Sequence, residues 1–269
     1  MDTNKRDTPD EQQEAMAFML NPFSTVIKSP KLLDGKVTRS AGLKLRKTGE
    51  IICSTSTVTT IVLLPGLSNS ICWKMDNVVS VPPVFPGHVG SDLDRTNVKM
   101  ARVVGSALRL NLVNNAETDD GYWEAARLTA DLSDFIVAVN GQGSQVSFNG
   151  DFSTDLANNS TYMTGRNRDL HKYIFKLNSF TTEHPFSSIK PTTDLDQMLD
   201  QTWDIVLIKV HGRSVLNSPS VLMFDTVSNQ EIIYQENTSL ARLMTPSIRD
   251  ANFHAYLNYS KVELPAFQV

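Results

Sequence analysis

The sequence MARVVGSALRLNLVNNAETDDGYWEAARL, residues 100–128, places a loop rich in turn-forming residues between two runs of strand-forming character. Asn114, Asn115 and the triplet Asp119-Asp120-Gly121 suit a tight reversal of the chain. The stretch therefore predicts a strand, an ordered loop and a second strand. A helical turn over residues 124–128 is the alternative for its end, because these residues are good helix formers. Side chains alternate between the two faces of a strand, and the buried face of the first strand is expected to carry Val104, Ser106, Leu108, Leu110 and Leu112.

Other segments on both sides of this stretch also have strand character. Residues 203–210 are apolar on both faces, which predicts a central strand. Residues 221–227 and 232–235, joined through Ser228-Asn229, predict a β-hairpin. The remaining candidates are residues 50–67, residues 135–148 with a break at Gly141 and Gly143, residues 170–180 and residues 253–261.

Helical signals are short. Thr8-Pro9, with Glu11 three residues after Thr8, has the form of a capping box, and Asn21-Pro22 is a stop, so a helix from residue 9 to about 20 is expected. Thr193 and Asp196 predict a second short helix that ends at Leu199. Strands and helices do not alternate, so a parallel sheet is not expected.

The predicted fold class is therefore all-β: a single antiparallel jelly-roll β-sandwich of about eight strands, with long loops and a short N-terminal helix. We assign residues 1–35 to an N-terminal helix and arm, and residues 36–269 to the jelly-roll domain. Residues 150–169 are rich in Asn, Ser, Thr and Gly and are expected as a surface insertion or small projection.

Charge limits the sites at which a polyanion could bind. The formal net charge of −4 argues against a surface that is basic throughout, so any contact with nucleic acid must be local. The run KVTRSAGLKLRK, residues 36–47, is the dense basic segment without an acidic residue. An edge strand whose charges discourage aggregation is the alternative interpretation. The candidate nucleic-acid contacts in this run are Lys36, Arg39, Lys44, Arg46 and Lys47.

Sequence motifs of catalysis, secretion and membrane insertion are absent. There is no nucleophile elbow, P-loop or zincin motif, and no apolar run approaches the ~18 residues of a membrane span. The N-terminal residues lack the order of a signal peptide, so synthesis in the cytosol is expected. Cys53 and Cys72 show no metal or disulfide spacing and are expected as small buried hydrophobes.

Two carboxylate pairs, Asp92/Asp94 and Asp119/Asp120, fall in predicted loops. Oxygen ligands of this kind hold hard cations such as calcium, and neighbouring subunits could share them. The alternative to a cation site is that these aspartates are turn residues in contact with solvent. No other cofactor is expected.

Several ordered segments together resemble a known family: TTIVLLPGL at 59–67, residues 102–128, TYMTGRNRDLHKYIFKLN at 161–178 and EHPF at 183–186. They are similar to the capsid proteins of small eukaryotic circular Rep-encoding single-stranded DNA viruses, including those similar to the bacilladnaviruses of diatoms. The resemblance implies a nodavirus-like coat with a single jelly roll, many copies of which form an icosahedral shell around the genome. It further implies no enzymatic activity, a location in the virion after synthesis in the host cytoplasm, with nuclear assembly as one option. The implied partners are further copies of the chain, packaged single-stranded nucleic acid and a host-cell receptor.

One feature departs from this family. Such coats usually begin with a long arginine-rich arm, whereas the first residues here offer only Lys5 and Arg6 before an acidic helix. Either residues 36–47 take over part of that role, or the chain packages weakly, or the arm is missing from this chain.

Two functions of other classes compete with the coat. A sugar-binding jelly-roll module would use aromatic rings such as Tyr122, Trp123 and Tyr162 to stack on a pyranose. A β-sandwich glycoside hydrolase would use two carboxyl groups as acid and base, and its candidates are Asp119, Asp120 and Glu124.

Overall fold

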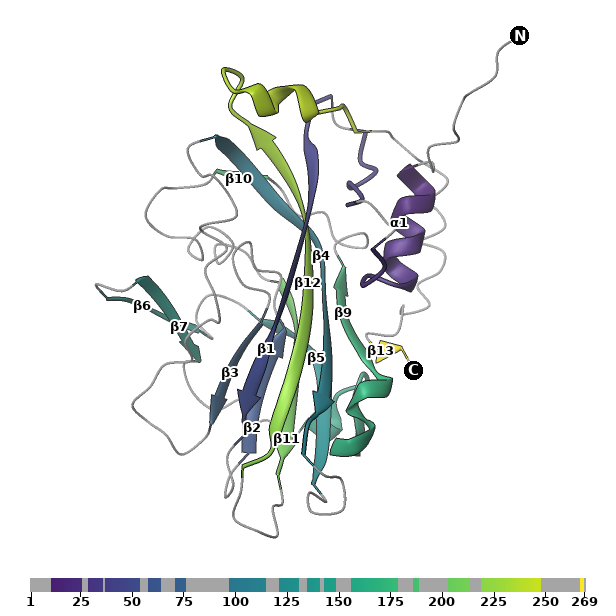
Figure 1. The fold of residues 1–269 in the computed structure, drawn as a ribbon, viewed down its shortest axis with the longest axis vertical. Coiled ribbons are helices and arrows are strands. Elements are labelled where there is room, and N and C mark those ends of the chain that lie inside the picture. The colour runs from purple at the N-terminus through teal and green to yellow at the C-terminus, as the bar shows by residue number, and fades with distance from the viewer. Residues whose placement is uncertain are drawn as a thin grey trace.

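Two antiparallel β-sheets lie face to face and form the body of the protein (Figure 1). The computed structural model describes residues 11–25, 29–35, 37–53, 58–63, 71–75, 97–114, 121–130, 135–140, 143–148, 156–178, 186–188, 203–212, 219–247 and 267–268. The first sheet has the strand order β1-β12-β4-β9-β13, with β10 also paired to β4. The second sheet has the order β3-β2-β11-β5-β8, and β6 and β7 form a separate hairpin.

The bounds of these elements are as follows. The first sheet comprises β1 Ala41–Ile52, β4 Val98–Leu112, β9 Ile174–Asn178, β10 Ser187–Ser188, β12 Val221–Tyr234 and β13 Phe267–Gln268. The second sheet comprises β2 Val58–Leu63, β3 Ile71–Met75, β5 Tyr122–Ala130, β8 Met163–Arg166 and β11 Trp203–His211. The hairpin comprises β6 Phe135–Asn140 and β7 Gly143–Phe148, and the helices are α1 Glu11–Leu20, η3 Leu156–Asn158, η4 Asn167–Lys172 and η5 Ser239–Leu243.

Strands that are far apart in the chain are neighbours in both sheets. β12 pairs with β1 and β4, and β11 pairs with β2 and β5, all antiparallel. The chain passes repeatedly from one sheet to the other, which gives the four-strand orders β1-β12-β4-β9 and β2-β11-β5-β8. This is the wrapping of a jelly roll, so the predicted fold class, including its short N-terminal helix, is confirmed.

Apolar side chains from both sheets fill the space between them. Trp123 is completely buried, and its ring meets the rings of Tyr173 and Phe175 edge-on at centroid distances of 4.9 and 5.7 Å. Gly165 lies opposite Trp123 on β8, where a Cβ atom would come within 3.0 Å of the indole nitrogen. Glycine therefore allows β8 to pack beside this ring. Other members of the core are Ile61, Leu63, Leu108, Leu110, Val206, Ile208 and Phe224.

Strand β4 is buried on both faces, so the prediction of one buried face is wrong in part. Leu108 and Leu110 face the second sheet, as predicted. Val104 and Ala107 instead pack on the outer side of the first sheet, in a cluster that includes residues of α1. The second apolar layer is the reason that β4 has buried residues at successive positions.

A β-bulge explains why Val104 does not share a face with Leu108. On β12, Asn229 is opposite Gly105 while the next residue, Gln230, is opposite Val103. Val104 is therefore passed over in the pairing, which breaks the alternation of side chains along β4.

Helix α1 covers the outer face of the first sheet (Figure 1). Phe18 packs directly over Gly105, where a Cβ atom would lie 2.7 Å from the ring. At the C-terminal end of the helix, Lys176 of β9 donates hydrogen bonds to the carbonyl oxygens of Met19 at 2.7 Å and Leu20 at 3.1 Å. Terminal helix carbonyls lack partners within the helix, so this lysine both satisfies them and ties the helix to the sheet.

Strand β12 replaces the predicted hairpin. The strand runs without a turn from Val221 to Tyr234. Ser228 and Asn229, expected as the turn, are buried and pair with β1 on one side and β4 on the other. Because both neighbours satisfy the backbone groups, the local turn preference of these residues does not prevail.

Within residues 50–67, predicted as one strand, the described residues belong to two strands in different sheets, since β1 ends at Ile52 and β2 covers Val58–Leu63. Residues 124–128 are part of strand β5 rather than a helical turn. Within 150–169, the described residues are part of the sandwich rather than a projection, because β8 pairs with β5 and Leu156 is buried. Residues 193–199 and 253–261 lie outside the described residues.

Two simpler expectations can also be compared with the structure. Cys53 is buried, as predicted. Among the described residues, no helix is long and apolar enough to span a membrane.

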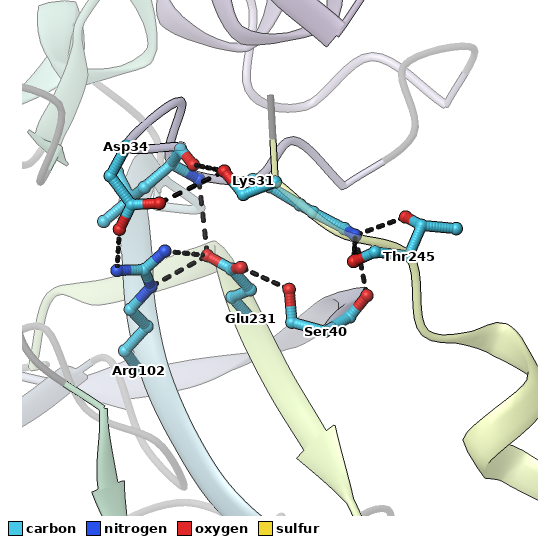
Figure 2. Close-up of polar contacts among 8 residues, drawn as sticks. Lys31, Asp34, Ser40, Arg102, Glu231 and Thr245 are labelled. Atoms are coloured by element: carbon cyan, nitrogen blue, oxygen red, sulfur yellow. Dashed lines mark hydrogen bonds and ion pairs between the residues drawn. The ribbon is translucent and has the colours of Figure 1, made fainter. Parts of the chain in front are cut away.

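A buried cluster of charged side chains fixes the segment before β1 to the first sheet (Figure 2). Arg102 of β4 lies between two carboxylates: its Nη1 is 2.7 Å from Asp34 Oδ2, and its Nε is 2.8 Å from Glu231 Oε2. The side chains of Arg102 and Glu231 are each 1% exposed. The guanidinium group also lies over the ring of Phe186, 4.2 Å from its centroid. Buried charges are tolerated only when they are paired, so detaching the segment would remove one of the two carboxylates that pair with Arg102.

A second cation of the cluster, Lys31, fixes the start of β1. Its Nζ donates to the carbonyl oxygens of Ser40 at 2.6 Å and Thr245 at 2.8 Å (Figure 2). Ser40 donates from its hydroxyl group to Glu231, and its backbone pairs with that of Thr245. The cluster thus joins the segment before β1, strands β4 and β12, and the segment after η5.

Replacing Glu231 with glutamine is expected to destabilise the protein by about 3 kcal/mol, because it keeps the shape of the side chain but leaves much of the buried Arg102 charge unpaired. Chemical unfolding of the purified protein measures the change. Asp225→Asn is the matched control, since it breaks the exposed pair with Arg46 and should cost less than about 1 kcal/mol. Equal effects of the two substitutions would contradict the stabilising role of the buried cluster.

Lys176 predicts a pH dependence of stability. Burial, and after it the nearby charge of Arg109, lowers the pKa of Lys176 from 10.5 to about 8. The unfolded chain therefore binds more protons between these values, and stability should rise with pH in that window. Relative to Lys176→Met, the parent should gain about 1–2 kcal/mol in free energy of unfolding from pH 7.5 to 10.

Urea titrations at several pH values measure this difference, and Lys99→Met, at an exposed lysine of β4, corrects for the loss of one charge. A constant difference between parent and Lys176→Met across the range would show that the prediction is wrong.

Candidate nucleic-acid interface

Strand β1 carries most of the predicted basic contacts and lies at the edge of the first sheet. It pairs with β12 along its whole length, from Ala41 opposite Ile232 to Ile52 opposite Val221. Leu43 and Leu45 pack against apolar residues of the sheet, while the alternate positions, which include Lys44 and Arg46, point outward. The strand thus has the location that the edge-strand interpretation requires.

Arg46 is paired with an acid from the neighbouring strand. Its Nε and Nη2 donate to the two carboxylate oxygens of Asp225 at 2.8 and 2.7 Å. These hydrogen bonds raise the pKa of Arg46. The arginine side chain is still 48% exposed, so it can meet solvent while its charge is partly neutralised.

Lys44 and Arg39 are held by backbone carbonyl groups. Lys44 Nζ donates to Ser24 O at 2.7 Å, and Arg39 Nε donates to Met244 O at 3.0 Å. Burial, and secondarily the charge of Arg46, lowers the pKa of Lys44. Both side chains therefore connect β1 and its approach to segments that are distant in the sequence.

The expectation that this run carries locally unopposed charge is wrong for Arg46, because the fold brings Asp225 beside it. Lys47 is partly buried on the same strand, and Lys36 lies outside the described residues. The structure gathers Arg39, Lys44, Arg46 and Lys47 along one edge, and their contact with nucleic acid stays a prediction.

The predicted metal ligands Asp92, Asp94, Asp119 and Asp120 lie outside the described residues. Within the ranges that the structure describes, no three His, Cys, Asp or Glu side chains gather as metal ligands would. Calcium at subunit contacts therefore stays a prediction.

Among the residues proposed for sugar binding and hydrolysis, Asp119 and Asp120 lie outside the described residues, and the others do not form such sites. Trp123 is buried in the core and cannot stack on a sugar. Tyr122 is 50% exposed, and its ring stacks on that of His211. Glu124 accepts a hydrogen bond from His211 Nε2 at 2.9 Å and lies 3.5 Å from Tyr162 Oη. A hydrolase of the predicted kind needs a second carboxylate near Glu124, but among the described residues the group that faces it is a histidine.

Sequence reasoning alone misses a second group of exposed cations, at η4 and the end of β8. The segment RNRDLHK, residues 166–172, contains Arg166, Arg168 and Lys172, all exposed. Asp169 interrupts this run, so charge density does not select it. Residues 166–169 fall in the predicted surface insertion and residues 170–172 in the strand predicted over 170–180, whereas the structure has helix η4 up to Lys172 and begins β9 only at Ile174. In the structure, this segment is recognised by two exposed arginines on either side of the buried Asn167.

Solved structures with the same fold are viral coats. The chain is similar to the VP2 subviral particle of infectious bursal disease virus, with a TM-score of 0.59, 10% identity, and coverage of 94% of this chain and 96% of that one. It is also similar to a chain in the structure of the Gx strain of that virus, with a TM-score of 0.60, 9% identity, and coverage of 94% of this chain and 95% of that one. At these identities the likeness concerns the fold.

Sequence relatives and a family model point to the same kind of protein. The chain is 25% identical to the capsid protein of Avon-Heathcote Estuary associated kieseladnavirus, over 90% of this chain and 84% of the relative. It is also 25% identical to the capsid protein of Chaetoceros diatodnavirus 1, over 86% and 76%. The model of the Shotokuvirus capsid protein matches residues 10–197 and 190–264. With nearly the whole chain matched, this protein belongs to the Shotokuvirus capsid protein family.

Proposed function

We propose that many copies of this capsid protein assemble into an icosahedral shell that encloses a single-stranded DNA genome, without enzymatic activity. The observation that carries the proposal is the jelly-roll strand order in a chain of a capsid family. The VP2 chain with a similar fold is described as a subviral particle, which supports extending assembly to this chain.

Exposed apolar side chains give assembly a physical basis. Ile52, Val113 and Met223 are 57%, 52% and 46% exposed. They lie near one another at one end of the first sheet, because Ile52 is opposite Val221 and the backbone N–H of Val113 donates to Val221 O. Soluble monomers seldom expose apolar groups in such clusters unless a partner covers them.

The purified protein should form particles, because obligate contacts between subunits bury about 2,000 Å² or more. Gel filtration and negative-stain imaging measure this. The double variant Ile52→Asp/Met223→Asp should lower particle yield while the subunit stays folded, and Leu243→Asp, at a residue 62% exposed on η5, is the matched control. A monomer that persists at high protein concentration across pH and salt would overturn the shell.

The genome is proposed to contact the basic run at residues 36–47 through Lys36, Arg39, Lys44, Arg46 and Lys47. The affinity for single strands should then fall with salt at a slope of roughly −0.7 per phosphate contact. Contacts of this kind carry no base preference.

The triple variant Lys44→Gln/Arg46→Gln/Lys47→Gln should flatten the salt slope by about two units and lower the encapsidated nucleic acid. Asp225→Asn is the opposite control, because it removes the partner of Arg46 and should strengthen binding. Oligonucleotide titrations at several salt concentrations and the ratio of absorbance at 260 and 280 nm measure these effects. If the triple variant packages as much nucleic acid as the parent, the cations of β1 only discourage aggregation at the edge of the sheet.

A further inference from the structure

The end of β8 and helix η4 present a group of cations that the basic run at residues 36–47 does not include. Arg166, Arg168 and Lys172 are all exposed. The helix lies at the lower right of Figure 1, drawn in green. Asp169 is the acidic residue within this segment, and a hydrogen bond of 2.7 Å from Lys172 engages its carboxylate.

The backbone that carries these cations is anchored in the sandwich. Asn167, between the two arginines, is completely buried. Its backbone N–H donates to Gly121 O at 3.0 Å, and its side-chain amide donates to His211 O at 3.2 Å. Leu170 is completely buried in the core. The arginines are therefore presented from a fixed backbone, which lowers the entropy lost when they bind a ligand.

The guanidinium groups of Arg166 and Arg168 have no hydrogen bond or salt bridge within the part of the chain that the structure describes. The charge of Arg168 does act on Asp169, but the carboxylate accepts its hydrogen bond from Lys172. Other arginines differ, since Arg127 is paired with Asp204 and Arg102 with Asp34 and Glu231. Two planar, always charged groups thus remain for an anionic ligand.

An aromatic ring lies beside Arg166. Tyr122 is directly opposite Arg166 across β5 and β8, so the two side chains share one face of the second sheet. The tyrosine ring stacks on that of His211 with centroids 4.2 Å apart and planes 7° apart. Glu124 in turn holds His211 at 2.9 Å. The ring is therefore held in one orientation, while the residue as a whole stays 50% exposed.

We propose that Arg166, Arg168 and Tyr122 form a binding surface for single-stranded nucleic acid, in which the arginines meet phosphates and the tyrosine stacks on a base. Sequence-tolerant binding of single strands combines these two elements, cations along the backbone and an aromatic platform for a base. A sulfated glycan would also satisfy the arginines, and its binding is one of the outcomes that the test below distinguishes. The inference rests on the proposed function only in that nucleic acid is the cargo of the shell.

Fluorescence anisotropy with a labelled 20-nucleotide oligo(dT), on the full chain, tests the proposal. Arg166→Gln/Arg168→Gln should weaken binding at least tenfold near 0.1 M salt and flatten the salt slope by about 1.4 units, or roughly 0.7 per lost contact. Tyr122→Leu should weaken binding about tenfold with an unchanged slope, because stacking releases no counterions, and Tyr122→Phe should bind like the parent.

Arg242→Gln is the matched control, because Arg242 is exposed on η5, which lies at the opposite end of the molecule from η4 (Figure 1). Arg166→Lys/Arg168→Lys keeps the charge and should retain the salt slope. Circular dichroism verifies folding, and the single variant Arg168→Gln, expected to flatten the slope by about 0.7 units, replaces the double variant if the latter misfolds.

Parent-like binding by Arg166→Gln/Arg168→Gln, or no binding by the parent, would overturn the surface. Binding of a sulfated heparin oligosaccharide that depends on both arginines, with no effect of Tyr122→Leu on oligo(dT), would also overturn it and indicate an anionic glycan. Particle formation is measured separately, so failure of the shell and failure of this surface are distinguishable.

Discussion

Burial of β4 on both faces is the constraint on which the layers of the molecule depend. A strand with apolar residues on its two sides cannot form the outer layer of a sandwich, because one apolar face would remain in water. Leu108 and Leu110 require the second sheet, while Val104 and Ala107 require α1. The small residue Gly105 sets how closely the helix approaches. The helix is thus a third layer that shares a core with the first sheet.

Charged side chains divide into two groups according to what surrounds them. Arg102, Glu231 and Asp34 are deeply buried and mutually paired, so they fix the segment before β1 in one position. The cations of β1 lie at the surface and have weaker, partly solvated partners. Exposed pairs contribute little to stability, so these cations remain able to exchange their partners for an anionic ligand at small cost.

The elements that sequence alone predicts well are those whose local pattern and tertiary environment agree. β11 is apolar on both faces and is central in its sheet, and β5 follows its loop as expected. The prediction fails for Ser228-Asn229, where two neighbouring strands override a local turn preference, and for Val104, where a bulge changes the alternation. Neither effect is visible without the partner strands.

The candidate site shows the same limit. Charge density in the sequence selects β1, but Asp225, which neutralises Arg46, is 179 residues away in the chain. Conversely, the exposed arginines on either side of Asn167 fall in a run that Asp169 interrupts. The structure shows that Asp169 accepts a hydrogen bond from Lys172. Tyr122 joins them because β5 and β8 pair, a contact that neither segment encodes by itself.

The position of β12 between β1 and β4 has a consequence for synthesis of the chain. β12 ends at Tyr234, so on the ribosome β1 and β4 are made long before the strand that joins them. Folding that depends on such distant pairings is slow and leaves unpaired strand edges exposed. Lysine and arginine on an open edge oppose its association with other chains. We therefore expect the cations of β1 to protect each nascent subunit in a crowded polysome.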